Sequence, residues 1–246
     1  MNAESARQLR LLDLQAIDTR LDQIGHARTH LPQLAELADL LGKARLIDDQ
    51  LVRSRTELDD VQREVRKAEA DVQLVRDRAA RNQSRLDSGQ GSAKDLQALQ
   101  HELASLARRQ SELEDLELEA MERSEDLDAR VGQLDADREQ LVARLASLES
   151  ERDAALADLA AEEAKVSSGR ADIVAGIGDE LAALYEKIRA SSGGLAAAEL
   201  KHRRCGGCRL ELNNVDLARI RAAAQDEVVR CEECRRIMIR TAESGL

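Results

Sequence analysis

Residues 86–99 of the chain read LDSGQGSAKDLQAL, and this stretch joins two long helical repeats. Gly89 and Gly91 stand among small polar residues, a composition typical of a turn, and leucines resume at Leu96. Apolar side chains recur at alternating spacings of three and four residues on both sides of this turn. Two heptad arms joined by a short turn must fold back antiparallel, so the sequence predicts a helical hairpin with its turn near 87–92.

The first arm carries an unbroken heptad seam in which thirteen of fifteen positions are apolar. Its positions are Leu37, Leu40, Ala44, Ile47, Leu51, Ser54, Leu58, Val61, Val65, Ala68, Val72, Val75, Ala79, Asn82 and Leu86. A repeat sustained over this length indicates a coiled-coil seam and a helical partner.

The second arm carries a matching seam in which fourteen of nineteen positions are apolar. Its positions are Leu96, Leu99, Leu103, Leu106, Gln110, Leu113, Glu117, Ala120, Ser124, Leu127, Val131, Leu134, Arg138, Leu141, Leu145, Leu148, Arg152, Ala155 and Leu159. The polar positions lie along the middle of the arm, where we expect loosening or a shift of register.

A shorter amphipathic helix is predicted over residues 4–26, and Pro32 suits the first turn of the next helix, over 33–86. The second arm, over 93–165, would be about 110 Å long at 1.5 Å per residue. Only the two earlier helices together match that length. We therefore expect the second arm to run back along both.

The composition agrees with long helices. Of 246 residues 35% are charged, and the chain has one Tyr and neither Phe nor Trp, although compact cores usually use aromatic side chains for bulk. The net charge of −11 comes from residues 1–194, since residues 195–246 carry a small basic excess. The second arm is the more acidic one, which favours pairing with the Arg-rich first arm over self-pairing; alternatively, these charges only solvate the outer faces. Such a rod should repel nucleic acid and anionic membranes.

One further amphipathic helix is predicted over residues 173–188, followed by a linker at Ser191-Ser192-Gly193-Gly194. The fold class is therefore mainly α. The predicted organisation is a coiled-coil helical hairpin over 1–190 and a small domain over 195–246.

The small domain contains two CxxC pairs separated by 22 residues, formed by Cys205, Cys208, Cys231 and Cys234. Two such turns can aim four thiolates at one ion, which predicts a closed tetrahedral site for one structural Zn²⁺. Gly206 and Gly207 suit a turn with positive φ. A redox dithiol, an iron site and a catalytic zinc are weaker alternatives.

The residues around the cysteines suit a zinc ribbon. A strand is predicted over 196–204, a brief helix over 216–223, and a strand on each side of the second CxxC pair, at 228–229 and 237–239. A domain of this size without aromatic residues has little core, so zinc should supply much of its folding free energy.

A cationic cluster surrounds this site and could contact nucleic acid or an acidic protein surface, or could simply be solvated. It consists of Lys201, Arg203, Arg204, Arg209, Arg230, Arg235, Arg236 and Arg240. Glu232 and Glu233 would oppose phosphate, and there is no aromatic side chain on which a base could stack.

No phosphate-binding loop, catalytic triad or cofactor motif is present in the sequence. Carboxylates on extended helices lack the concave, dry surroundings that acid–base catalysis needs, so we expect no enzymatic activity. No signal peptide and no run of about 18 apolar residues is visible, so we expect a cytoplasmic protein without a membrane partner.

Several motifs together resemble the bacterial family of coiled-coil hairpins with a C4-type zinc ribbon, which includes flagellar-regulator-like proteins. The run Lys94-Asp95-Leu96-Gln97 resembles the segment after the hairpin tip in that family, 184–189 the helix before the ribbon, and Cys205–Leu210 and Val229–Ile237 the ribbon. The family often has Pro in the second CxxC turn and Gly soon after it, whereas this chain has Glu232, Glu233 and Arg235.

The resemblance covers nearly the whole chain and implies a kinked, elongated hairpin with a ribbon at its base. Members are linked to flagellar regulation, type III secretion, and binding of transcription factors or RNA, so the role it implies is that of an interaction or regulatory protein. We expect a non-enzymatic adaptor whose hairpin presents to a protein partner either the faces that flank its seam or its tip, with Lys94, Asp95 and Gln97. The ribbon would be a second contact. A nucleic-acid-binding protein that acts through the cationic cluster is the alternative, and a homodimer stays open.

Overall fold

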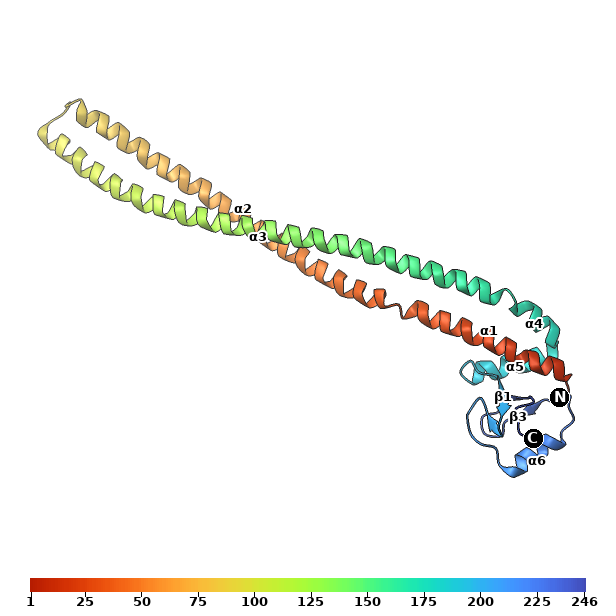
Figure 1. Cartoon of the computed structure of the whole chain (residues 1–246). Coiled ribbons are helices and arrows are strands. Elements are labelled where there is room, and N and C mark those ends of the chain that lie inside the picture. The colour runs from red at the N-terminus through yellow and green to blue at the C-terminus, as the bar shows by residue number, and fades with distance from the viewer. The chain divides into compact units, whose positions relative to one another are not determined.

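A computed structural model describes all 246 residues, and helices dominate it (Figure 1). The helices are α1 (Ser5–Thr29), α2 (Pro32–Asp87), α3 (Ala93–Ser167), α4 (Arg170–Ile177), α5 (Asp179–Ser191) and α6 (Asn214–Ala222). The strands are β1 (Ala197–Lys201), β2 (Arg204–Cys205), β3 (Val229–Arg230) and β4 (Ile237–Arg240). The chain divides into two compact units, Ala35–Glu149 and the combination of Met1–Leu34 with Ser150–Leu246. No helix is both long and apolar enough to cross a lipid bilayer.

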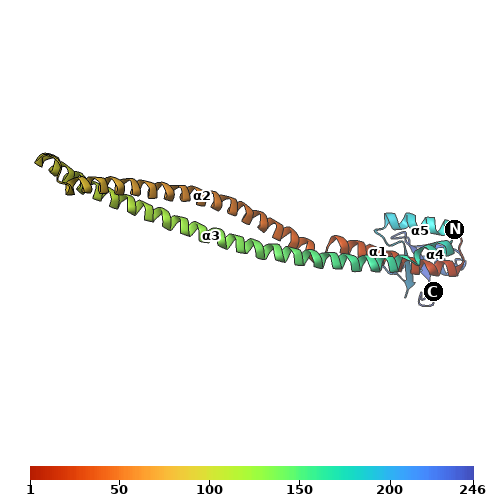
Figure 2. The same cartoon turned by 90° about the horizontal axis from the view of Figure 1, so that it is seen from above.

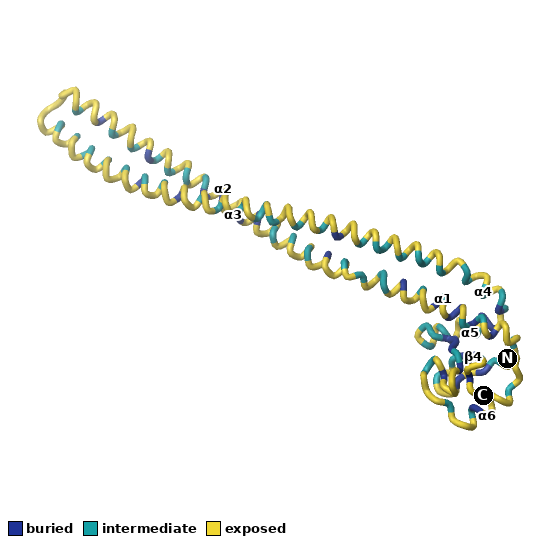
Figure 3. Tube along the Cα trace, viewed as in Figure 1, coloured by how far each residue is buried: buried dark blue, intermediate teal, exposed yellow.

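The unit Ala35–Glu149 is an antiparallel hairpin in which α2 and α3 lie side by side (Figures 1 and 2). The heptad seam is confirmed, because every buried residue of this unit occupies a seam position. Figure 3 shows short buried segments spaced along both arms among exposed ones. All seam positions of α2 are buried or half-buried, and in α3 only Arg138 is exposed. The side chains outside the seam are mostly exposed, so the hairpin's stability comes from one narrow apolar strip.

The predicted turn between the arms is confirmed at residues 88–92. Gly89 and Gly91 have φ of 65° and 133°, conformations that other residues adopt at a cost. Ser92, just before α3, and Asp95 in its first turn cap the helix reciprocally. The Asp95 carboxylate accepts hydrogen bonds from the Ser92 backbone N–H (3.0 Å) and hydroxyl (2.7 Å), and the Ser92 hydroxyl oxygen accepts the Asp95 N–H (3.3 Å). This cap holds the pKa of Asp95 below its usual value and satisfies N–H groups at the helix start.

Ion pairs cross the hairpin seam in both directions. Arg55 of α2 contacts Asp135 at 2.7 Å, while Arg138 of α3 contacts Asp48 at 2.6 Å. Four further pairs of the same unit are Arg76–Glu114, Arg78–Glu102, Arg123–Glu64 and Arg144–Glu36. These side chains are about half exposed, so each pair contributes little to stability. In these ion pairs α2 and α3 each supply both arginines and carboxylates. The charge pattern between the arms is therefore mixed, and does not consist of a basic arm that faces an acidic one.

The seam contains one buried amide without a partner. Asn82 is 8% exposed, and its side-chain nitrogen is buried and makes no hydrogen bond. A buried, unsatisfied donor costs about 1–3 kcal/mol.

We predict that Asn82→Leu raises the thermal unfolding temperature of the hairpin, because it removes this unsatisfied donor and fills the seam position with apolar volume. Circular dichroism at 222 nm during heating measures the change. Asn82→Ala is the control, with a smaller gain because it leaves the volume empty. A lower unfolding temperature for Asn82→Leu would contradict the assignment.

In the other unit, the end of α3 runs along α1, as the length argument predicts. Arg20 and Arg28 of α1 form ion pairs with Glu162 (2.5 Å) and Glu163 (2.6 Å) of α3. The single helix predicted over 173–188 is wrong, since α4 ends at Ile177 and α5 begins at Asp179. Gly178 between them has φ of 86°, outside the helical region, so the chain bends there and both helices pack beside α1.

The strands form one sheet in the order β2-β1-β4-β3. The central pair β1 and β4 is parallel, and both outer pairs are antiparallel. The strand predicted over 196–204 is interrupted, because His202 and Arg203 take positive φ and turn the chain from β1 into β2. The short helix and the strands beside the second CxxC pair are confirmed as α6, β3 and β4.

The two faces of the sheet pack against different partners. Ile237 and Ile239 of β4 join a core with Leu11 and Leu14 of α1 and with side chains of α4 and α5. Met238, between them, points to the opposite face, where a second core contains Ile220 of α6 and the cysteines. Successive side chains of β4 point to opposite faces of the sheet. One strand therefore packs against the helices on one face and against the cysteine core on the other.

The predicted linker at 191–194 is a hydrogen-bonded turn. The Gly194 N–H donates to the Arg189 carbonyl (3.1 Å), and the Gly194 carbonyl accepts from Gln15 of α1 (2.8 Å). The Gln15 side-chain oxygen also accepts from the N–H groups of Ala196 (2.7 Å) and Ala197 (3.2 Å). Gln15, buried in α1, therefore ties the start of β1 to the helix, and the segment has little of the freedom that its composition suggests.

Asp18 of α1 is the centre of a buried polar cluster. Its carboxylate, 1% exposed, accepts hydrogen bonds from Arg170 (2.6 and 3.1 Å) and from the Tyr185 hydroxyl (2.8 Å), and Arg189 lies 3.5 Å away. Burial raises the pKa of Asp18, but these hydrogen bonds and the two arginine charges outweigh it, so the pKa is lower than usual. The cluster joins α1 to α4 and α5.

We predict that Asp18→Asn destabilises this unit by about 2–3 kcal/mol at pH 7, because two arginines lose their buried counter-charge. An aspartate with a lowered pKa stabilises the fold above its unfolded pKa, and this contribution is lost as pH falls through the folded value. The difference between wild type and variant should therefore shrink below about pH 4. Urea unfolding followed by fluorescence of Tyr185, the sole Tyr in a chain without Trp, measures it. An equal difference at pH 7 and pH 3 would refute this role of the charge.

Candidate metal centre

The four cysteines come from two similar turns at the ends of strands. Cys205 ends β2 and Cys208 follows it, while Cys231 follows β3 and Cys234 precedes β4. Their sulfur atoms all lie within 4.8 Å of one another, and the cross-turn pairs Cys205–Cys234 and Cys208–Cys231 are 3.8 and 3.9 Å apart. Sulfurs at the corners of a tetrahedron around zinc, with Zn–S bonds of about 2.3 Å, lie about 3.8 Å apart. The donor set therefore fits one Zn²⁺ held by four thiolates.

Both CxxC turns have the same backbone geometry. In each, the residue after the second cysteine donates its N–H to the carbonyl of the first cysteine, Arg209 to Cys205 at 2.7 Å and Arg235 to Cys231 at 2.9 Å. Both arginines have positive φ, 64° and 61°, which L-residues adopt at a cost of about 1–2 kcal/mol. The zinc turns are thus closed by a left-handed residue placed after, and not inside, each CxxC.

Gly206 and Gly207 are needed for a different reason from the predicted one. Neither has positive φ. A Cβ on Gly206 would lie 2.8 Å from the Glu199 carbonyl oxygen, which accepts the Gly206 N–H at 2.9 Å, and a Cβ on Gly207 would lie 2.7 Å from the Arg236 side chain. The glycines therefore allow the first turn to pack closely against β1 and the second turn.

The surroundings of the thiols favour a closed metal site. Burial raises the pKa of Cys205 to about 12, although N–H groups of Cys208 and Gly207 face its sulfur. Burial also raises the pKa of Cys234, but hydrogen bonds from Arg236 and from the neighbouring thiols outweigh this effect and lower the pKa to about 7. A metal must replace the proton on each buried sulfur, and the four thiolates would fill its coordination sphere. The ion is one structural Zn²⁺, held inside the second core of the sheet.

The cationic cluster is spread over the ribbon, and most of its members have partners. Arg236 and Arg240 donate to backbone carbonyls, Arg240 to those of Ala223, Ala224, Gln225 and Glu227 after α6. The remaining contacts are Lys201–Glu243 (2.6 Å), Arg204–Glu211 (3.6 Å), Arg235–Glu232 (3.1 Å), Arg203–Asn214 (2.6 Å) and Arg230 to the Arg235 carbonyl (2.9 Å). The Arg209 side chain alone forms neither a hydrogen bond nor an ion pair.

The three residues at the predicted hairpin tip lie in the first turn of α3. Lys94, Asp95 and Gln97 are all exposed there. Asp95 is occupied with the cap of the helix, which leaves the side chains of Lys94 and Gln97 open to solvent.

Two comparisons with protein families cover most of the chain. Residues 14–193 match the CT398-like coiled coil hairpin domain, and residues 204–238 match the C4-type zinc ribbon domain. The chain belongs to the CT398-like coiled-coil hairpin family. This agrees with the resemblance seen in the motifs around the tip and the cysteines.

Relatives of this family member match over nearly their whole length. An uncharacterized protein of Mycobacterium tuberculosis (strain H37Rv) is 41% identical over 240 residues, which is 98% of both chains, and one of Mycobacterium leprae is 30% identical over 89% of this chain and 94% of its own. A solved structure from Mycobacterium smegmatis has a TM-score of 0.84 at 38% identity and covers 98% of this chain and 100% of its own. CT398 of Chlamydia trachomatis has a TM-score of 0.70 at 17% identity, over 96% and 98% of the two chains, and shares the fold.

We predict that Arg235→Gly stabilises the zinc-loaded ribbon by about 0.5–1 kcal/mol. The substitution relieves the positive φ, while the exposed ion pair with Glu232 contributes little. Thermal unfolding of the zinc-loaded chain measures it. Arg235→Ala is the matched control, because it deletes the same ion pair but keeps the strained backbone, and it should give no gain. Equal stability of the two variants would show that φ at this position carries no strain.

Proposed function

We propose that the chain is a non-enzymatic cytoplasmic adaptor whose hairpin binds an amphipathic helix of a partner protein. In this proposal residues 1–190 present the binding surface, and residues 195–246 form a zinc-stabilised ribbon that serves as a second contact. The two matched families are a coiled coil and a zinc ribbon, neither of which is an enzyme family, and this supports the proposal. The observation that carries it is an apolar groove on the hairpin.

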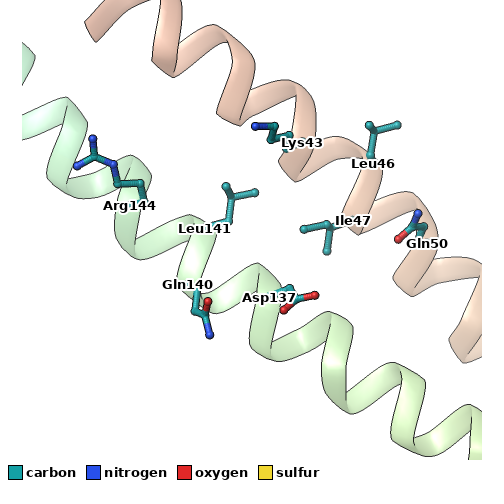
Figure 4. A pocket seen from close by; sticks show the side chains of 8 residues that line it. All are labelled: Lys43, Leu46, Ile47, Gln50, Asp137, Gln140, Leu141 and Arg144. Carbon is teal, nitrogen blue, oxygen red and sulfur yellow. The ribbon is translucent and has the colours of Figure 1, made fainter.

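The groove lies within the unit Ala35–Glu149, between α2 and α3 (Figure 4). Ile47 and Leu141, two facing seam residues, form its floor, and Leu46 stands beside them on α2 with 63% of its surface exposed. The cavity measures about 520 Å³. Seam side chains of a coiled coil are normally covered by flanking residues, so an open stretch of seam beside an exposed leucine offers apolar area to a partner.

Charges around the groove indicate which partner it would accept. Lys43 and Arg144 lie toward one end, Asp137 and Gln50 lie toward the other, and Gln140 lies on the α3 side (Figure 4). Lys43 and Arg144 also pair with Asp39 and Glu36, so their charges are partly balanced. An amphipathic helix would place apolar side chains on Leu46, Ile47 and Leu141, with an acidic residue near the basic end and a basic one near Asp137. Its affinity would come mainly from the apolar contact.

Nucleic acid is the less favoured partner. Seven of the eight members of the cationic cluster are engaged with carbonyls or carboxylates of the chain, and Arg209 is its unpaired member; outside the cluster, the exposed Arg221 of α6 has no partner either. Phosphate binding depends on several free cations acting together. The net charge of −11 also opposes approach of a polyanion.

We predict that Leu46→Glu reduces capture of the partner at least tenfold, because a carboxylate on the groove cannot be desolvated against an apolar helix face. Val52→Glu is the control, since Val52 is 67% exposed on the same helix outside the groove. The measurement is quantitative mass spectrometry of proteins retained by the zinc-loaded full chain and by each variant, with retained RNA and DNA assayed in parallel.

Loss of the same proteins with Leu46→Glu, but not with Val52→Glu, supports the proposal. Equal capture by both variants, or retention of nucleic acid that falls with rising salt and with Arg209→Ala, would overturn it in favour of binding through the ribbon.

A further inference from the structure

Arg236 occupies a position between the zinc turns and the helices of the same unit. It follows the second CxxC pair directly, yet its guanidinium reaches the turn between α5 and β1. We propose that Arg236 couples zinc binding to the docking of α1, so that occupancy of the metal site controls how firmly the N-terminal helix is held. This goes beyond the structural role of zinc in the ribbon, because α1 lies on the opposite face of the sheet.

On the metal side, both CxxC turns hold Arg236. Its carbonyl accepts the Cys231 N–H at 3.0 Å, and its own backbone N–H faces the Cys234 sulfur. Its side-chain Cδ packs over Gly207 of the first turn, so closely that a Cβ there would lie only 2.7 Å away. The position of the Arg236 side chain therefore depends on the two turns being drawn together, which is what a shared zinc ion does.

On the helix side, the Arg236 guanidinium forms hydrogen bonds with the turn that follows α5. Its Nε donates to the Leu195 carbonyl at 2.8 Å, and its terminal nitrogen donates to the Ser192 carbonyl at 2.9 Å. Hydrogen bonds from a charged donor to partly buried carbonyls are among the stronger ones in proteins. The half-buried Arg236 thus connects the second CxxC turn to the turn between α5 and β1 without passing through the sheet.

The same turn is held from its other side by α1. Gln15 donates to the Gly194 carbonyl at 2.8 Å and accepts the Ala196 N–H at 2.7 Å. Residues 192–196 are therefore hydrogen-bonded from two sides, by Arg236 beside the zinc site and by Gln15 of α1. If the CxxC turns separate, the Arg236 side chain is no longer held in position, and its hydrogen bonds to the turn at 192–196 are lost. Gln15 of α1 is then bonded to a segment that is itself mobile.

A second route leads through β4, because Met238 packs on the cysteine side and Ile237 on the side of α1. This apolar route would remain when the guanidinium is removed. Substitution of Arg236 should therefore weaken the coupling between zinc and α1 while the sheet and the four cysteines stay in place.

Hydrogen–deuterium exchange of the full chain, with and without zinc, tests the proposal. In the wild type, removal of zinc with a chelator should speed exchange at least tenfold both in residues 192–197 and in residues 8–18 of α1, and should change the fluorescence of Tyr185. Arg236→Gln should keep one zinc per chain, should already exchange faster at 192–197 with zinc bound, and should show a several-fold smaller further response of α1 to zinc removal. Arg235→Gln is the matched control, because its exposed side chain contacts only Glu232, and it should respond as the wild type does.

Gln15→Leu provides an independent test, because it removes the hydrogen bonds between α1 and the turn at 192–196 and does not touch the zinc site. It should likewise reduce the response of α1 to zinc removal, and it decides the matter if Arg236→Gln loses the metal. The proposal is overturned if zinc removal from the wild type changes exchange only around the cysteines. It is also overturned if either variant responds as fully as the wild type, because independent structural roles give additive effects.

Discussion

The constraint on which the ribbon depends is the small size of its sheet. Four strands of two to five residues, without an aromatic side chain, cannot bury enough apolar surface to fold alone. The sheet is stabilised on both faces, by the zinc site and α6 on one and by α1, α4 and α5 on the other. Backbone geometry then makes one strand serve two cores, since Met238 and its neighbours Ile237 and Ile239 point in opposite directions. The ribbon and the helices of this unit are therefore one folding unit.

Polar groups of α1 complete this arrangement. Gln15 replaces missing ladder partners at the start of β1, and Asp18 balances Arg170 and Arg189 while it accepts the Tyr185 hydroxyl. Both side chains are buried, and each would be costly if its partners were absent. They give the contacts of α1 a specificity that packing of Leu11 and Leu14 alone would not provide. In the proposed coupling, the hydrogen bonds of Gln15 and Arg236 with the turn at 192–196 transmit the loss of zinc at the cysteines to α1.

The hairpin follows a simpler rule. Its stability comes from one apolar seam, while its outer faces carry exposed ion pairs of low individual value. Such a rod can tolerate an open stretch of seam, as at Ile47 and Leu141, because neighbouring heptads hold the arms together. The floor of this stretch is apolar, and Lys43, Arg144 and Asp137 lie toward its ends; the proposed function rests on this open stretch of seam. At the metal site, the four thiolates would fill the coordination sphere of one Zn²⁺.

The sequence by itself determined the hairpin, its turn, the four clustered cysteines and the family, because heptad spacing, glycine-rich turns and CxxC pairs act over short distances along the chain. Features that depend on contacts between distant segments were decided only by the tertiary structure. The break at Gly178, the bound turn at 191–194 and the steric role of Gly206 are visible only once α1, β1 and the first CxxC turn are packed together. The burial of Asp18 was not predicted. Its place on one helical face with Leu14 and Leu21 is a signal that could have indicated it, but its partners Arg170 and Tyr185 lie more than 150 residues away. Local pattern specifies elements, whereas the partners of buried polar groups are set by which elements meet, and no spacing along the chain encodes that.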